Sequence, residues 1–237
     1  MTDLRIGLLL FPDLTQLDLT GPYEVFRKAP GAGTLLLAKT LDPVRAETGM
    51  RILPDTTLAE CPQLDVLCVP GGPGVNAAME DSELLDFLRA QAAAARFVTS
   101  VCTGALVLGA AGLLHGRRAT THWSVHDLLA AFGAVPTPGR VVRDGNLFTG
   151  GGVTAGIDFA LLVVAELFGE SVAQAVQLQI EYAPEPPFDA GSPRTAPAEV
   201  LAAVRSRGAA MRARREQIVA RAASGPRASR HIRDADR

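Results

Sequence analysis

Apolar runs alternate with helical patterns along most of this chain. Three runs are almost continuously apolar, which is typical of parallel strands buried on both faces. They span residues 4–11, 64–69 and 97–101. A helix is expected after the first run, capped by Thr20 and with Pro22 in its first turn, so that Asp18 lies just before it. An amphipathic helix is expected over 81–95. Strands that alternate with helices at this spacing predict an α/β fold built on a doubly wound, mostly parallel sheet with helices on both faces.

The other segments extend this pattern. They predict a strand at 34–40, extended segments over 43–58, a hairpin that turns at Asp144-Gly145, a long apolar helix over 156–169, a proline-rich arm over 183–197 and a last helix from about Ala198.

The run at 97–101 breaks at Cys102 and gives way to the small-residue helical pattern of 103–110. A strand, a sharp turn and a helix make the geometry of a nucleophile elbow, which projects a reactive side chain from a strained corner. Because the start of a helix favours negative charge, we expect the pKa of Cys102 to be lowered and its thiolate to act as a nucleophile. Free cysteines are also often buried, so plain packing is the alternative interpretation.

Four candidate residues follow predicted strands. Asp18 comes after the first strand, Gly71 and Gly72 after the run at 64–69, and Cys102 after the run at 97–101. Ligands of parallel α/β sheets bind outside the carboxyl ends of the strands, so these positions are expected to share one rim. The glycine amides are candidates for an anion-binding nest or part of an oxyanion hole, although most Pro-Gly pairs simply turn the chain.

The remaining polar candidates carry weaker signals. Thr120 or Thr121 is expected to cap a helix that carries His122 and His126. Surface or supporting packing is the simpler interpretation of both histidines, because neither belongs to a metal-binding spacing with a third ligand. Three cysteines at unrelated spacings predict neither a disulfide framework nor a metal site.

Charge divides the chain unevenly. The net charge is −2, but residues 205–237 carry +7 and residues 1–204 carry −9. A solvated helix face with a frayed end is the simpler interpretation of the basic segment, although such tails also touch nucleic acid or acidic surfaces. The chain shows neither a secretory signal nor an apolar run long enough to span a membrane, so we expect a cytoplasmic protein without a membrane partner.

Six segments, taken in order, resemble the isonitrile (isocyanide) hydratases of the PfpI superfamily over residues 4–215. They are FPDLTQLDLTGP, VPGGPG, VTSVCTGALVLGAAGLL, RRATTHW, RDGNLFTGGGVTAGIDFAL and EYAPEPPFDAGSPRTAP. The resemblance implies a flavodoxin-like sheet and a homodimer. We therefore expect one PfpI-like α/β domain over residues 1–200, followed by a C-terminal helix and basic, frayed tail over 201–237.

The resemblance also implies roles at the rim. Cys102 would be the nucleophile, Asp18 its acid/base partner, and Thr103 with the Gly71-Gly72 loop would surround the reacting carbon. A thiolate that attacks an isonitrile carbon needs a proton as the bond forms, and water then converts the thioimidate to an N-substituted formamide. Neither a metal nor an organic cofactor is required, and the expected partner is a small isonitrile.

Two positions differ from the wider superfamily, and they bear on which functions the chain can have. Many members have His directly after the nucleophilic Cys and a Glu in the acid position, whereas this chain has Thr103 and Asp18. That difference disfavours protease and glyoxalase functions.

Two other function classes remain open. Similar domains form the N-terminal half of AraC-type transcription regulators, which suggests a ligand-sensing role. The residues after Pro197 are too few for such a regulator's helix-turn-helix region, so no specific nucleic-acid partner is expected. A redox-responsive protein whose Cys102 is oxidised to a sulfenic or sulfinic acid is the third interpretation.

Overall fold

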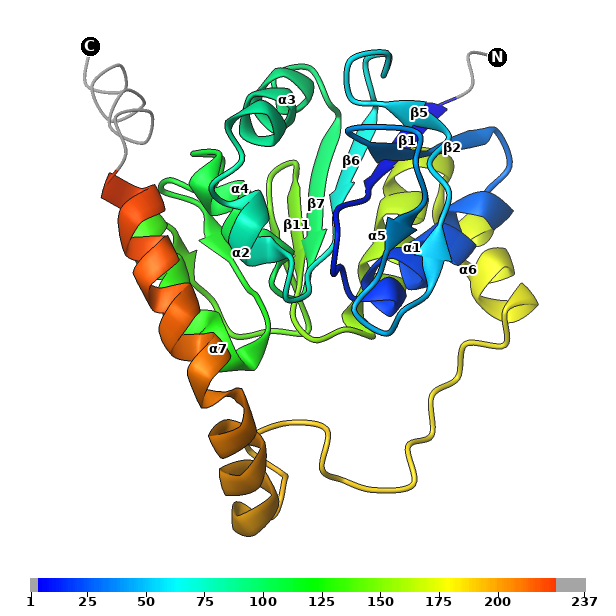
Figure 1. The fold of residues 1–237 in the computed structure, drawn as a ribbon. Helices are drawn as coiled ribbons and strands as arrows, with labels where there is room; N and C mark the ends of the chain where they lie inside the picture. The colour runs from blue at the N-terminus through cyan, green and yellow to red at the C-terminus, as the bar shows by residue number, and fades with distance from the viewer. Residues whose placement is uncertain (1–3, 225–237) are drawn as a thin grey trace.

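The computed structural model describes residues 4–224. A seven-stranded sheet forms the centre of the molecule (Figure 1). Its strands are β1 (Leu4–Leu9), β2 (Ala32–Ala38), β5 (Thr56–Thr57), β6 (Val66–Val69), β7 (Phe97–Val101), β10 (Val141–Asp144) and β11 (Leu147–Gly150). They lie in the order β10-β11-β7-β6-β1-β2-β5, and only the β10–β11 hairpin is antiparallel. The parallel strands β2-β1-β6-β7-β11 follow the 2-1-3-4-5 order of flavodoxin-like folds, so the predicted fold class is confirmed.

Short strands and helices complete the fold. The strand pairs are β3 (Val44–Arg45) with β4 (Arg51–Ile52), and β8 (Arg118–Ala119) with β9 (Val135–Pro136). The helices are α1 (Gln16–Lys28), α2 (Val75–Ala78), α3 (Ser82–Ala92), α4 (Gly104–Ala110), the 3₁₀ helix η1 (Trp123–Phe132), α5 (Ala155–Phe168), α6 (Glu170–Gln179) and α7 (Ala198–Ser224). In the described part of the chain, no helix is both long and apolar enough to cross a membrane.

The helices form two groups on opposite faces of the sheet. Helix α1 packs against α5 and α6, whereas α4 packs against α2, α3, η1 and α7 (Figure 1). The strands between these groups are shielded on both sides, and all four residues of β6 are buried. This double burial explains why the central strands are continuously apolar rather than alternating.

The start of α1 differs from the prediction. The helix begins at Gln16, and Thr20 lies inside it with its hydroxyl donating to Gln16 Oε1 at 3.0 Å. Thr15 precedes the helix in an extended conformation, and its carbonyl accepts the Asp18 amide at 3.0 Å. Asp18 therefore lies in the first helical turn, and Pro22 is inside the helix.

The segment after β8 also differs from the prediction. Neither predicted threonine caps η1; the His122 ring accepts from the Ser124 amide instead, and Val125 interrupts the helical conformation. The Thr121 hydroxyl donates to the Cys102 carbonyl at 2.6 Å. A side chain that sequence spacing assigned to a local cap thus makes a tertiary contact.

Helix α4 starts in very close contact with the end of β6. A Cβ atom added at Gly104 would lie 2.3 Å from the Val69 carbonyl oxygen and 2.7 Å from that of Pro70. Backbone atoms cannot move aside as a flexible side chain can. Only glycine at this position lets α4 begin directly behind Cys102.

We expect Gly104→Ala to lower the free energy of unfolding by about 3 kcal/mol, because the new methyl group overlaps two carbonyls. Urea unfolding monitored by circular dichroism measures the change. Gly208→Ala is the matched control, since Gly208 lies in α7 with no described atom within 4 Å of the added carbon. That control should be stabilised by up to about 1 kcal/mol. A loss for Gly104→Ala no larger than the change in the control would contradict the close contact.

Candidate functional site

Cys102 lies at a strained corner between β7 and α4. Its φ angle is 53°, a left-handed conformation that cysteine rarely adopts. The surrounding backbone holds it there: the Cys102 amide donates to the Gly150 carbonyl at 3.1 Å, and its carbonyl accepts from Thr121. The corner between a buried strand and a helix is the elbow that the sequence predicted.

The structure brings every predicted site residue to one cluster. The Gly71 amide donates to Asp18 Oδ2 at 2.9 Å, and the Gly72 amide donates to Thr103 Oγ1 at 2.9 Å. Thr103 follows Cys102 directly, and its hydroxyl donates to the Gly72 carbonyl at 3.4 Å. The ends of β1, β6 and β7 thus place an acid, a glycine loop and a thiol in contact, as expected for this edge of a parallel sheet.

The amides of Gly71 and Gly72 bind side chains of the protein, whereas the sequence suggested that they bind an anion or form part of an oxyanion hole. Both amides of the glycine loop are engaged in this way, so neither points unpaired at a ligand. At Gly71 an added Cβ would lie 2.5 Å from the Thr103 nitrogen and 2.8 Å from Asp18 Oδ2. The loop is therefore built to hold Asp18 and Thr103 closely, and an oxyanion hole made from these two amides is not preformed.

Asp18 is a buried acid with unused bonding capacity. Burial raises its pKa to about 7, while the bonds from Gly71 and Cys102 oppose the rise and Glu47 adds to it. Oδ1 is buried and has no hydrogen-bond partner among the described residues. Buried polar atoms rarely lack partners, so the open oxygen marks a place where a proton, water or substrate atom can bind.

The expectation of a lowered pKa at Cys102 is wrong. Burial is the largest effect and raises the pKa of the thiol, and the negative charge of Asp18 raises it further. The amide and hydroxyl of Thr103 oppose this change but are outweighed. At neutral pH the sulfur is therefore held as a thiol beside the acid, and the two groups titrate as a coupled pair.

Sequence reasoning missed Arg215, which comes from the distant helix α7. It is only 5% exposed; its Nε donates to Asn76 Oδ1 at 2.8 Å and its Nη2 donates to the Gly72 carbonyl at 3.0 Å. Burial lowers the pKa of Arg215, and Cys102 opposes this change. One signal was available: Arg215 shares the helical stripe of Ile218 and Val219, the other buried residues of α7.

A cavity of about 690 Å³ lies between η1 and α7, next to this cluster. His122 and Arg215 line it, and both also contact the cluster, because the His122 amide donates to the Cys102 carbonyl at 3.3 Å. Trp123 and Met211 add apolar surface. Neither Asp18, Cys102 nor Thr103 is among its lining residues, so this cavity adjoins the cluster without reaching the sulfur.

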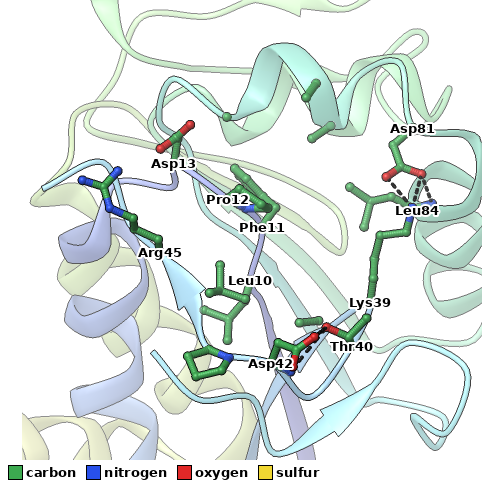
Figure 2. A pocket seen from close by; sticks show the side chains of 16 residues that line it. Leu10, Phe11, Pro12, Asp13, Lys39, Thr40, Asp42, Arg45, Asp81 and Leu84 are labelled. Carbon is green, nitrogen blue, oxygen red and sulfur yellow. Dashed lines mark hydrogen bonds and ion pairs between the residues drawn. The ribbon is translucent and has the colours of Figure 1, made fainter. Parts of the chain in front are cut away.

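A second cavity, of about 500 Å³, lies beyond the end of β1 (Figure 2). Lys39 reaches across one side of it to Asp81, with Nζ 2.8 Å from the carboxylate, while Asp13 and Arg45 lie on the other side. Neither Asp18 nor Cys102 is among its lining residues. Across the described residues, no three His, Cys, Asp or Glu side chains form a group that could hold a metal ion.

Comparison with known proteins shows what the chain is similar to. The sequence model of the DJ-1/PfpI family matches residues 4–166. The chain is 61% identical over 221 residues to the isonitrile hydratase of Pseudomonas putida, an alignment that covers 93% of this chain and 97% of that protein.

Solved structures agree with this relationship. A THiJ/PfpI family protein from Pseudomonas syringae superposes with a TM-score of 0.90 at 48% identity, covering 92% of this chain and 91% of that chain. DJ-1beta of Drosophila melanogaster superposes with a TM-score of 0.70 at 29% identity, covering 77% and 100%.

The buried acid predicts a pH-dependent stability. Since the pKa of Asp18 rises from 3.8 to about 7 on folding, the folded protein retains a proton between these values that the unfolded chain has released. Wild-type stability should therefore fall across this window, whereas Asp18→Asn has no proton to lose. The variant should gain up to about 4 kcal/mol relative to wild type between pH 4 and pH 8.

Urea unfolding of both proteins at the two ends of this range measures the gain. The amide oxygen of Asn can still accept the Gly71 bond, so the comparison isolates the charge. An equal difference in the free energy of unfolding between the two proteins at both pH values would show that folding does not raise the pKa of Asp18.

Proposed function

We propose that this chain, which belongs to the DJ-1/PfpI family, is an enzyme that adds water to isonitriles and releases N-substituted formamides. The observation that carries the proposal is the 61% identity to an isonitrile hydratase along nearly the whole of both chains. The contact of a thiol, an acid and a threonine at the strained elbow gives that similarity a chemical basis.

The first step joins the Cys102 sulfur to the terminal carbon of the isonitrile. Asp18 takes the thiol proton as the sulfur attacks and delivers it to the same carbon, which leaves a neutral thioimidate on Cys102. An acid whose pKa is about 7 can both accept and give a proton near neutral pH. Its unpartnered Oδ1 is the atom available for this transfer.

The second step hydrolyses the thioimidate. Asp18 orients a water molecule, takes a proton from it as the oxygen adds to the carbon, and gives that proton to the nitrogen. Collapse of this adduct breaks the carbon–sulfur bond and releases the formamide, and Asp18 carries the remaining hydroxyl proton to the sulfur. Thr103, whose hydrogen bonding lowers the pKa of the Cys102 thiol, stabilises the sulfur as it leaves with negative charge. Overall, one isonitrile and one water give one N-substituted formamide.

The protein acts as a homodimer in this proposal. The arm over 183–197 runs apart from the body between α6 and α7 (Figure 1), and Phe188 on it is 78% exposed. Leu178 is 81% exposed, and Val200 and Val204 of α7 are also exposed. A second copy of the chain would bury this apolar surface, and two-fold symmetry is the simplest closed arrangement. The reduced thiol that catalysis needs fits a cytoplasmic location.

We expect Cys102→Ser to abolish hydration of a small alkyl isonitrile, because a serine hydroxyl at this corner is a far weaker nucleophile. Formamide production by purified protein, followed by NMR, measures this. In the same assay Asp18→Asn should lower turnover by about 10²- to 10⁴-fold, since an amide gives no acid proton. Cys61→Ser, which changes a half-buried cysteine outside the cluster, should retain most activity. Substantial turnover by Cys102→Ser would remove Cys102 as the nucleophile.

Sedimentation analysis at micromolar concentration should show a mass of two chains. Phe188→Asp should shift the protein toward monomer, because it places a charge on the apolar surface that the second copy would cover. Glu185→Gln, at an exposed position on the same arm, is the control, and its sedimentation should still give the mass of two chains. A monomeric wild-type protein would refute the dimer.

A further inference from the structure

Three arginines and two carboxylates line the cavity of about 690 Å³ between η1 and α7. Both carboxylates bind the same arginine, because Arg212 pairs with Asp127 at 2.6 Å and with Glu216 at 2.8 Å. In the part of the chain that the structure describes, neither Arg205 nor Arg215 has a carboxylate at ion-pair distance. The lining therefore holds two guanidinium groups without an acidic partner.

Arg215 is the more buried of these two arginines, with 5% of its surface exposed. Its Nε donates to Asn76 Oδ1 and its Nη2 donates to the Gly72 carbonyl, and both acceptors are neutral. Its Nη1, which carries two N–H groups, has no hydrogen-bond partner among the described residues. A buried cation is normally paired with a negative group, because the surrounding protein solvates it less well than water. The lining of the cavity thus has a free donor where an anion can bind.

Other lining residues suit an apolar body. Trp123 and Met211 contribute an aromatic ring and a flexible thioether, and the guanidinium of Arg205 lies over the Trp123 ring at 6.0 Å from its centroid. Burial and the charge of Arg215 lower the pKa of His122, so this ring is neutral near neutral pH. Apolar and aromatic surface with a few placed charges, in a cavity of this volume, is typical of a small-molecule site.

The cavity beyond the end of β1 has the opposite charge balance (Figure 2). Lys39 and Arg45 line it together with three acids, Asp13, Asp42 and Asp81. Lys39 is already paired with Asp81 at 2.8 Å. A preference for anions is therefore a property of the cavity between η1 and α7, and does not extend to both cavities.

We propose that the cavity between η1 and α7 is a binding site for a small organic carboxylate with an apolar body. The carboxylate binds the guanidinium groups of Arg215 and Arg205, and the apolar body lies against Trp123. A guanidinium presents its N–H groups in a plane that matches the two oxygens of a carboxylate. An inorganic anion would leave the apolar part of the lining uncovered.

This site is separate from the proposed active site, since Cys102 and Asp18 do not line the cavity. The two sites are neighbours through Arg215, whose Nη2 donates to the Gly72 carbonyl of the glycine loop. The inference goes beyond the proposed hydration reaction, so binding can be measured without any isonitrile.

Trp123 is the only tryptophan of the chain, so its fluorescence reports binding in this cavity. Phenylacetate is the probe, and we expect it to change the tryptophan fluorescence in a saturable way at or below millimolar concentration. Phenylacetamide has the same apolar body without the charge, and calorimetry should show that it binds at least about 10-fold more weakly. Inorganic phosphate, which lacks the apolar body, should also bind more weakly than phenylacetate.

Three results with these probes would overturn the proposal. They are the absence of a saturable signal with millimolar phenylacetate, an affinity for phenylacetamide equal to that for phenylacetate, and an affinity for phosphate that equals or exceeds it.

Substitutions on α7 test which groups hold the carboxylate. Arg205→Glu reverses an exposed charge, so we expect a folded protein that binds phenylacetate about 10-fold more weakly in calorimetry. Arg207→Glu is the matched control, because Arg207 is exposed on the same helix but does not line the cavity. Its affinity should equal that of wild type. Wild-type affinity in Arg205→Glu, or an equal loss in both variants, would overturn the proposal.

Arg215→Gln removes the buried charge and should weaken phenylacetate binding by about 10- to 100-fold. Circular dichroism first establishes whether this variant folds, because Arg215 also holds Asn76 and the Gly72 carbonyl. A folded Arg215→Gln with wild-type affinity would overturn the proposal. If it does not fold, Arg205→Glu and Arg207→Glu are the deciding pair.

Discussion

The site depends on two hydrogen bonds from neighbouring backbone amides. Gly71 holds the Asp18 carboxyl and Gly72 holds the Thr103 hydroxyl, so a single loop fixes the acid and the elbow relative to each other. Side chains cannot replace these glycines, because a Cβ at Gly71 would overlap both Thr103 and Asp18. Three further features bring the acid and the elbow to this loop. They are the left-handed backbone of Cys102, the close contact of α4 with the end of β6, and the start of α1 before Asp18.

Burial determines the chemistry of the cluster. It raises the pKa of both Asp18 and Cys102, so each group retains a proton more strongly than it would in water. A protected thiol avoids unwanted oxidation, and an acid with a pKa near neutrality transfers protons easily in both directions. In the proposed mechanism the thiolate forms as Asp18 takes the proton, which couples activation of the nucleophile to delivery of that proton to the substrate.

Helix α7 connects residues 198–224 with this centre. It packs against η1 and α4, and Arg215 reaches the glycine loop from a position 143 residues away in sequence. The DJ-1/PfpI match ends at residue 166, so this arginine lies outside the part of the chain that defines the family.

The sequence by itself determined the sheet, the elbow and the rim. Buried parallel strands need continuous apolar runs, and their carboxyl ends meet at one edge, so Asp18, Gly71, Gly72 and Cys102 could be grouped without coordinates. Local patterns could not reveal that Thr121 and the glycine amides bind distant partners. Nor could they reveal that burial raises the pKa of the Cys102 thiol more than the start of the helix lowers it. They also placed Arg215 on a solvated face. Desolvation and long-range contacts depend on what the folded chain packs around a group, and only the tertiary structure decided them.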